Sequence, residues 1–253
     1  MFRNAIVRTP GSSIRMGLSK ASMGKPDHEM ALLQHEIYIA QLKALGLEVR
    51  ILPPEEMFPD STFIEDTALC TPDCAVITSP GAVSRRGEIT GMRQILSDYF
   101  TNIEEIKLPG TLEAGDVMRT GKIYFIGLSE RTNSEGADQL IVILKKYGYG
   151  GIKVPLTGLL HLKSGVSYIE NNNLLVTGEL IDNILFTGFN RIPVNENEQY
   201  AANSLWINGT VLVPEGYPGT REKIEKAGYN TLTLDVSEFR KVDGGLSCLS
   251  LRF

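Results

Sequence analysis

The chain ends in a double glycine followed by alternating side chains, Lys241-Val242-Asp243-Gly244-Gly245-Leu246-Ser247-Cys248-Leu249-Ser250-Leu251. Glycine allows backbone angles that are closed to other residues and lets a ligand come close to the main chain. In an extended strand, the period of two puts Leu246, Cys248 and Ser250 on one face. The stretch therefore predicts a C-terminal strand with a cysteine near its beginning. The alternative interpretation is a small buried thiol that packs as a hydrophobe.

Four earlier stretches place a polar residue before two short strands joined by a turn. The second strands of these predicted hairpins are Ala75–Ser79, Ile123–Leu128, Leu174–Thr177 and Thr210–Val213. The polar residues at the hairpin mouths are regularly spaced. The separation is 48 positions from Glu65 to Glu113 and again from Glu113 to His161, then 42 to Asn203 and 45 to Cys248. A period in the mid-forties indicates a repeated supersecondary unit.

Between the hairpins lie segments with helical patterns, at about 87–100, 133–147 and 219–228, and a short irregular stretch follows residue 180. A further helix is expected from Pro26 to about Leu45, because proline favours a helix start and Gly46 a helix end. A strand over 47–52 follows it. The repeated unit is thus hairpin, helix and strand, in five copies.

The last copy has only its first strand, and the N-terminal strand over residues 3–8 has no hairpin partner. Pairing the two would close a ring and remove two exposed sheet edges. The sequence therefore predicts a single domain over residues 1–253, an α/β fold of the five-bladed propeller type around a central channel. A doubly wound sheet is the alternative, but it expects single strands alternating with helices.

Composition excludes several classes of protein. The net charge of −5 and the pI near 5.4, without a basic block, argue against a nucleic-acid partner. The N-terminal residues are too charged for a signal peptide, and no apolar run approaches a membrane span. Three cysteines do not suggest a disulfide framework, so we expect a cytoplasmic protein. Cys70 and Cys74 are expected to be structural.

A closed ring would bring Glu65, Asp66, Glu113, Asp116, His161, Asn203 and Cys248 to one mouth. Converging carboxylates repel one another unless a cation lies between them. Zinc is one candidate, although the chain has no closely spaced metal motif. A guanidinium ion suits better, because its planar fork pairs with carboxylates through two hydrogen bonds. A thiol, an imidazole and a carboxylate around such a cation are the parts needed for nucleophilic substitution at carbon.

The chain resembles the dimethylarginine dimethylaminohydrolases (dimethylargininases), which belong to the guanidine-modifying pentein, or amidinotransferase, superfamily. The resemblance runs along the whole chain and rests on four motifs: Phe63-Ile64-Glu65-Asp66-Thr67, Leu112-Glu113-Ala114-Gly115-Asp116-Val117, His161-Leu162-Lys163-Ser164 and Asp243-Gly244-Gly245-Leu246-Ser247-Cys248. It implies a five-bladed propeller that converts methylated arginines and water to citrulline and a methylamine, without a cofactor.

The resemblance also implies a role for each matched residue. Cys248 would be the nucleophile, His161 the proton donor and later the activator of water, and Glu113 the carboxylate that orients the histidine. Glu65 and Asp66 would hold the guanidinium nitrogens. Arg85 and Arg131 would clamp the substrate's α-carboxylate. Asp60 and the carbonyls of Leu18 and Val242 would hold its α-amino group.

Other assignments stay open at this stage. Within the superfamily, an arginine or agmatine deiminase shares the core residues. Arginine deiminases carry an extra helical domain for which this chain has no segment, and agmatine has no carboxylate for Arg85 and Arg131. A non-catalytic pentein binding module would lack Cys248 and His161. An outer strand of a blade could also pair across a homodimer.

Overall fold

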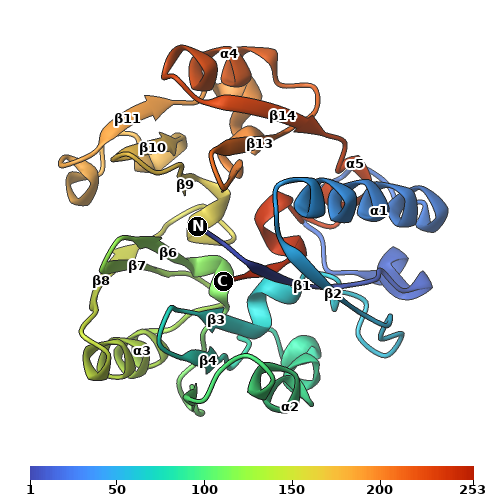
Figure 1. Ribbon diagram of the computed structural model, residues 1–253, viewed down its shortest axis with the longest axis vertical. Helices are drawn as coiled ribbons and strands as arrows, with labels where there is room; N and C mark the ends of the chain where they lie inside the picture. The colour runs from blue at the N-terminus through green and yellow to red at the C-terminus, as the bar shows by residue number, and fades with distance from the viewer.

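The structure, a computed structural model that describes all of residues 1–253, contains five sheets of three strands each. The sheets stand around a common centre as the blades of a propeller (Figure 1). In chain order the strands are β1 (Asn4–Arg8), β2 (Glu48–Leu52), β3 (Ala68–Cys70), β4 (Ala75–Ile77), β5 (Ile103–Glu105), β6 (Val117–Thr120), β7 (Ile123–Leu128), β8 (Gly150–Pro155), β9 (Val166–Tyr168), β10 (Asn173–Val176), β11 (Asn190–Pro193), β12 (Leu205–Ile207), β13 (Thr210–Pro214), β14 (Asn230–Leu234) and β15 (Leu251–Arg252).

Every blade has the same pattern of strand pairing. In the second to fifth blades an antiparallel hairpin comes first, and the third strand then pairs in parallel with the second strand of that hairpin. A parallel neighbour requires a crossover connection, and the helices supply it. The predicted unit of hairpin, helix and strand, and the five-bladed α/β propeller itself, are confirmed.

Helices α1 (His28–Ala44), α2 (Met92–Ser97), α3 (Ser134–Lys146) and α4 (Pro218–Lys226) provide four of the crossovers. Short 3-10 turns replace a helix in the fourth blade, and the brief helix α5 (Ser237–Arg240) leads back toward the centre. The predicted helix at 87–100 is wrong in its first part. Residues Val83–Ile89 form a 3-10 turn, and the left-handed angle of Gly91 (φ 80°) separates that turn from α2.

The first blade joins the two ends of the chain. Strand β15 pairs antiparallel with β1 through Ala5↔Arg252 and Ile6↔Leu251, and the two ends of the chain lie side by side near the middle of Figure 1. The predicted strand from Leu246 is wrong in its first half. Leu246–Leu249 is a 3-10 turn, because the Asn203 side chain accepts a hydrogen bond from the Ser247 N–H (3.0 Å) and Cys248 N–H bonds to the Gly245 carbonyl (3.1 Å).

The hairpin mouths form a ring of 3-10 turns, Ile64–Thr67, Ala114–Asp116, Leu162–Ser164, Glu196–Ala202 and Leu246–Leu249, in which neighbours touch. Side chains connect one turn to the next through backbone N–H groups. Asp66 accepts from Gly115 (2.8 Å), Asp116 from Leu162 (2.8 Å) and Asn203 from Ser247 (3.0 Å). The links between blades are therefore one periodic polar residue, Asn203, and two residues within three positions of the periodic ones, Asp66 and Asp116.

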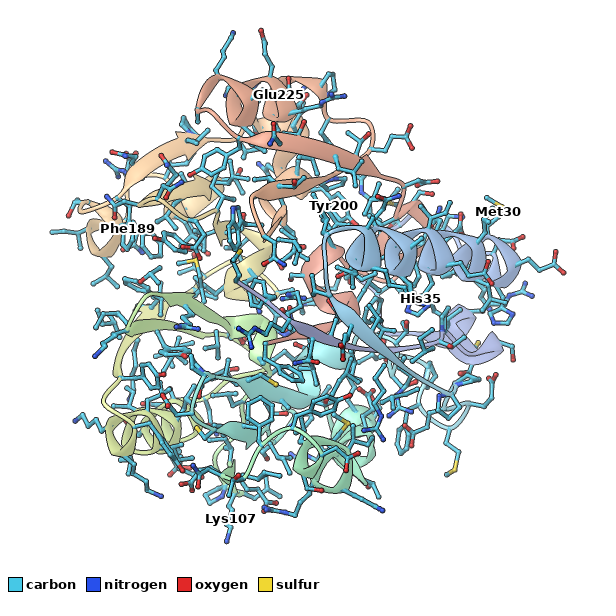
Figure 2. The ribbon with its side chains drawn as sticks, in the orientation of Figure 1. Met30, His35, Lys107, Phe189, Tyr200 and Glu225 are labelled. Atoms are coloured by element: carbon cyan, nitrogen blue, oxygen red, sulfur yellow. The ribbon has the colours of Figure 1, made fainter.

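The hydrophobic core is divided among the gaps between adjacent blades, where side chains fill the space between ribbons (Figure 2). One cluster, for example, joins Ile169 and Leu175 of the fourth blade to Val211 and Val213 of the fifth. Each blade therefore depends on its two neighbours for burial of its apolar faces. No helix combines the length and the apolar composition that membrane crossing requires.

Candidate active site

A cavity of about 260 Å³, here called the front cavity, opens beside the ring of turns. Of the ten site residues expected from the sequence, eight line it: Leu18, Asp60, Asp66, Arg85, Arg131, His161, Val242 and Cys248. They come from four blades and from the loop before α1. Glu113 lies behind the cavity wall, and Glu65 lies elsewhere.

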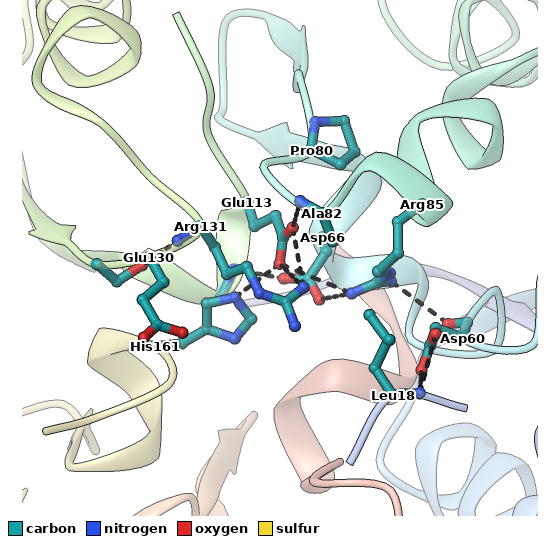
Figure 3. A network of polar contacts seen from close by, with 12 residues as sticks. Leu18, Asp60, Asp66, Pro80, Ala82, Arg85, Glu113, Glu130, Arg131 and His161 are labelled. Carbon is teal, nitrogen blue, oxygen red and sulfur yellow. Dashed lines mark hydrogen bonds and ion pairs between the residues drawn. The ribbon is translucent and has the colours of Figure 1, made fainter. Parts of the chain in front are cut away.

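The imidazole of His161 is held by Glu113. Its Nε2 lies 2.8 Å from Oε2 of Glu113, and Oε1 of this fully buried carboxylate accepts from the Ala82 N–H (3.2 Å) (Figure 3). Burial lowers the pKa of His161, but the charges of Asp66 and Asp116 and the bond to Glu113 outweigh it and raise the pKa to about 9. At neutral pH the ring is an imidazolium ion and can donate a proton.

Cys248 is half-buried and faces both this cavity and a smaller one behind it. Burial, followed by the negative charges of Glu65 and Asp66, raises the pKa of the thiol to about 12. A thiol in these surroundings is neutral at pH 7. Only the arrival of positive charge beside the sulfur would favour the thiolate.

Arg85 is buried among carboxylates at the floor of the cavity. Its Nη1 lies 2.7 Å from Asp66, and Nε and Nη2 bond to Glu88 at 3.0 and 2.8 Å (Figure 3 shows the contact with Asp66). Burial raises the pKa of Asp66, but the charges of His161 and Arg85 outweigh it and lower the pKa overall. Sequence reasoning missed Glu88, and the available signal was its spacing of three residues from Arg85 within one turn.

Arg131 is the more accessible of the two arginines. Its side chain is 16% exposed, and its closest carboxylate contact is a long one, 3.4 Å from Nη1 to Glu113. Most of its N–H groups therefore have no carboxylate partner within the protein. A planar guanidinium with open donors suits a carboxylate ligand.

The loop before α1 covers the cavity from one side. The Leu18 N–H donates to Asp60 (3.0 Å), the Ser19 hydroxyl donates to the Lys241 carbonyl (2.8 Å), and the Lys20 N–H donates to Asp243 (2.6 Å). Leu18 and Asp60 thus meet, as Figure 3 also shows. Val242 lines the same wall.

The structure differs from the sequence expectation at Glu65. Its carboxylate is buried against Lys163 Nζ (2.7 Å) and Arg252 Nη2 (2.6 Å), and it accepts from the Ser247 hydroxyl (2.8 Å). These residues line another cavity, of about 540 Å³, and Glu65 is absent from the front cavity. The two cations pair with this carboxylate, and its bond to Ser247 connects it to the turn that carries Cys248.

Asp66, Glu113 and His161 bring ligand atoms within 4.8 Å of one another, a spacing that a metal ion could use. The Arg85 guanidinium already lies against Asp66, and His161 Nε2 already bonds to Glu113. Cys248 is not part of this group. The arrangement fits an imidazolium held by carboxylates better than the zinc site considered from the sequence.

Known proteins with similar chains include two enzymes of one name. The chain is 50% identical to N(G),N(G)-dimethylarginine dimethylaminohydrolase of Pseudomonas aeruginosa over the full length of both, and 32% identical to the enzyme of that name from Streptomyces coelicolor over 99% of this chain and 96% of the other. No protein-family model matches the chain.

Solved structures agree. A cysteine-to-serine variant of the Pseudomonas aeruginosa enzyme, in complex with citrulline, matches all of both chains with a TM-score of 0.99 and 49% identity. The N-terminal domain of the cyanobacterial arginine dihydrolase ArgZ matches with a TM-score of 0.89 at 18% identity over 100% of this chain and 98% of that one. The second likeness shows a shared fold.

Proposed function

This chain belongs to the dimethylarginine dimethylaminohydrolase family, and we propose that it hydrolyses N-omega-methylated arginines. Asymmetric dimethylarginine would yield citrulline and dimethylamine, and monomethylarginine would yield citrulline and methylamine. The observation that carries the proposal is that Cys248 and His161 line one cavity together with Asp66, Asp60 and Arg131. A nucleophile, a proton donor and groups for both ends of an arginine therefore face the same space.

The amino-acid end of the substrate would lie under the loop that carries Leu18. Arg131 would bind the α-carboxylate through its N–H groups that have no partner in the protein. Arg85 would donate a further hydrogen bond from the N–H of Nη1 that Asp66 does not accept. Asp60, with the carbonyls of Leu18 and Val242, would hold the α-amino group. The positive charge of Arg131 and the negative charge of Asp60 then fix the orientation in which an arginine binds.

The guanidinium end would lie against Asp66, beside His161 and Cys248. Asp66 lines the cavity, and Glu113 lies directly behind the imidazole. A guanidinium held there brings positive charge beside Cys248, which lowers the thiol pKa, and the thiol proton leaves to solvent. The substrate would thus activate its own nucleophile, because His161 is already protonated and cannot accept that proton.

The thiolate then attacks the central carbon of the guanidinium and forms a C–S bond. His161 donates its proton to the departing nitrogen, and the C–N bond breaks to release the amine. The neutral imidazole next takes a proton from water, whose oxygen bonds to the same carbon. Breakage of the C–S bond restores the thiolate, and loss of the remaining hydroxyl proton gives citrulline.

The activity assay compares citrulline formed from asymmetric dimethylarginine, monomethylarginine, arginine and agmatine. We expect turnover of the two methylated arginines. Absence of citrulline from both would overturn the proposal, and preference for arginine or agmatine would favour a deiminase. Cys248→Ser should abolish turnover and still bind substrate, and retained turnover in that variant would remove Cys248 as the nucleophile.

We further propose that residues 1–253 act as one catalytic domain in the cytoplasm, without a nucleic-acid or membrane partner. The cross-blade hydrogen bonds support a single unit, and the three cysteines are free thiols, as a reducing compartment requires. Light scattering of the purified protein would decide between a monomer and a homodimer.

A further inference from the structure

The cavity of about 540 Å³ that Glu65 faces, here called the channel cavity, has no part in the reaction described above. Residues of β3, β6, β9, β12 and β15, one strand from each blade, line it, so it is the central channel of the propeller. It shares no lining residue with the front cavity. Both ends of the chain, near the middle of Figure 1, also line it, and Met1 is 98% exposed, so the channel cavity reaches the surface there.

One layer of side chains separates the channel cavity from the small cavity, of about 60 Å³, beside Cys248. Lys163, Asn203 and Ser247 line both spaces. The Asn203 amide connects the other two, because it donates to the Lys163 carbonyl (2.9 Å) and to the Ser247 hydroxyl (3.0 Å). The inner end of the channel cavity therefore lies one layer behind the nucleophile.

This inner end carries one more positive charge than negative. Lys163 Nζ (2.7 Å) and Arg252 Nη2 (2.6 Å) both pair with Oε1 of Glu65. Arg252 also donates to two backbone carbonyls, whereas Glu65 is the only partner of Lys163 Nζ in the protein. An ammonium group has three donors, and the Lys163 side chain is only 15% exposed. A largely buried cation with open donors favours an anionic ligand.

The other charged groups along the channel cavity cancel. Arg119 and the Met1 amine are positive, and Glu170 and the terminal carboxylate of Phe253 are negative. Arg119 is exposed, and its Nε already donates to the Gly121 carbonyl (2.9 Å). The uncompensated charge is therefore that of the inner end, at Lys163.

The walls between the two ends are largely apolar and rich in aromatic rings. The rings are those of Phe2, Tyr124, Tyr168, Trp206 and Phe253. Such rings pack against a flat apolar group in offset or edge-to-face arrangements. The volume lies within the range of roughly 300–1,000 Å³ that is typical of small-molecule sites. The channel cavity thus suits a ligand with an aromatic body and one carboxylate.

We propose that the channel cavity is a second binding site, for a small aromatic monocarboxylate whose carboxylate pairs with Lys163, and that its occupation slows turnover at Cys248. The binding goes beyond the proposed function, because it requires neither the nucleophile nor a methylated arginine. The effect on turnover rests on the proposed function.

The effect on turnover follows from the contacts of Glu65. Its carboxylate accepts from the Ser247 hydroxyl (2.8 Å), and Ser247 precedes Cys248. A ligand carboxylate that shares Lys163 weakens the pair between Lys163 and Glu65. It also adds negative charge one layer from the thiol, and negative charge disfavours the thiolate. We therefore expect kcat to fall while KM stays nearly constant.

Trp206 provides the test, because it is the only tryptophan of the chain and lines the channel cavity. The probe is phenylbutyrate, and phenylbutyramide is its uncharged analogue. Titration followed by tryptophan fluorescence and by calorimetry should give an affinity at least tenfold higher for the acid. Equal affinities, or no binding of the acid by either method, would overturn the site. A rise in KM at constant kcat would place the probe in the front cavity and would also overturn it.

Lys163→Met keeps the length of the side chain and removes its charge. The affinity of this variant for phenylbutyrate should fall at least tenfold, to that of the amide. Arg119→Met is the matched control, since it removes an exposed cation of the same cavity and should change the affinity less than about twofold. Equal losses would contradict the role of Lys163. If thermal melting shows that Lys163→Met folds poorly, the comparison of acid and amide on the unmodified protein still decides.

The two proposals fail in different ways. If the unmodified protein forms no citrulline from either methylated arginine, the proposed function is wrong, and the binding test is unaffected. If citrulline forms and phenylbutyrate binds without lowering kcat, the connection from the channel cavity to Cys248 is wrong.

Discussion

Nη2 of Arg252 lies 2.6 Å from Oε1 of Glu65, so the next-to-last residue of the chain is paired with a carboxylate of the second blade. Nη1 of the same arginine donates to the carbonyls of Ser247 and Ser250 (2.8 and 2.7 Å). Glu65 in turn accepts from the Ser247 hydroxyl. Ser247 precedes the nucleophile, so this pair fixes the position of the Cys248 sulfur through its neighbour.

Arg252→Ala should therefore impair both stability and catalysis. Removal of one partner leaves a buried carboxylate with less compensation, which costs about 3 kcal/mol of unfolding free energy. Urea unfolding measures this loss, and kcat should fall more than KM rises. Arg93→Ala is the control, because its pair with Glu105 is largely exposed and its loss should cost less than about 1 kcal/mol. Equal losses for the two variants would contradict the assignment.

The imidazolium of His161 should persist well above neutral pH. Because its folded pKa of about 9 lies above the unfolded value of about 6.5, its contribution to stability is complete below pH 6.5 and is lost as the pH rises through 9. NMR titration of the ring follows this directly, and kcat should decline over the same upper range. Glu113→Gln removes the hydrogen-bonded charge and should move the titration to lower pH. An unchanged titration in that variant would show that Glu113 does not set the pKa.

The Cys248 thiol should be neutral in the ligand-free protein. With its pKa raised to about 12, ultraviolet absorbance of the thiolate should be absent at pH 7 and still small at pH 9. Cys248→Ser provides the baseline, because it retains Cys70 and Cys74. Addition of a bound guanidinium compound should increase the difference signal at constant pH. A full thiolate signal before any ligand is added would remove the need for activation by substrate.

The two arginines of the front cavity should behave differently. Arg131→Gln should raise KM at least tenfold and leave stability nearly unchanged, because its side chain is partly exposed and its contact with Glu113 is long. Arg85→Gln removes the cation among Asp66, Glu88 and Glu113, and should lower the unfolding free energy by about 3 kcal/mol or more. Steady-state kinetics and urea unfolding of both variants separate the roles. A stable Arg85→Gln protein would contradict this division.

The architecture could be predicted from the sequence because its period has a direct physical origin. Asp66, Asp116 and Asn203 each bind the backbone of the next turn, so residues at or within three positions of the repeated ones hold the ring together. The turn sequences between these residues predicted which strands pair as hairpins. Cys248, His161 and Glu113 could likewise be placed at one mouth, since they occupy equivalent positions of different repeats.

Other features depended on geometry that a sequence period does not contain. Glu65 and Asp66 are neighbours, yet they face different cavities, and only the angle of their turn decides which. The pairing of Arg85 with Glu88 and the place of Tyr200 behind Cys248 arise from packing between turns. Leu246–Leu249 resembles a strand in its alternation of side chains but forms a 3-10 turn, in which the Ser247 N–H donates to the Asn203 side chain, 44 positions away.

The pairing of β1 with β15 also bears on how the protein is made. During synthesis, the first blade cannot be completed until residues 251 and 252 have left the ribosomal exit tunnel. Until then the nascent chain is an open arc with an unpaired β1 edge, a form exposed to misassembly. Cys248 lies in the same late stretch, so the catalytic centre cannot assemble before these residues have emerged.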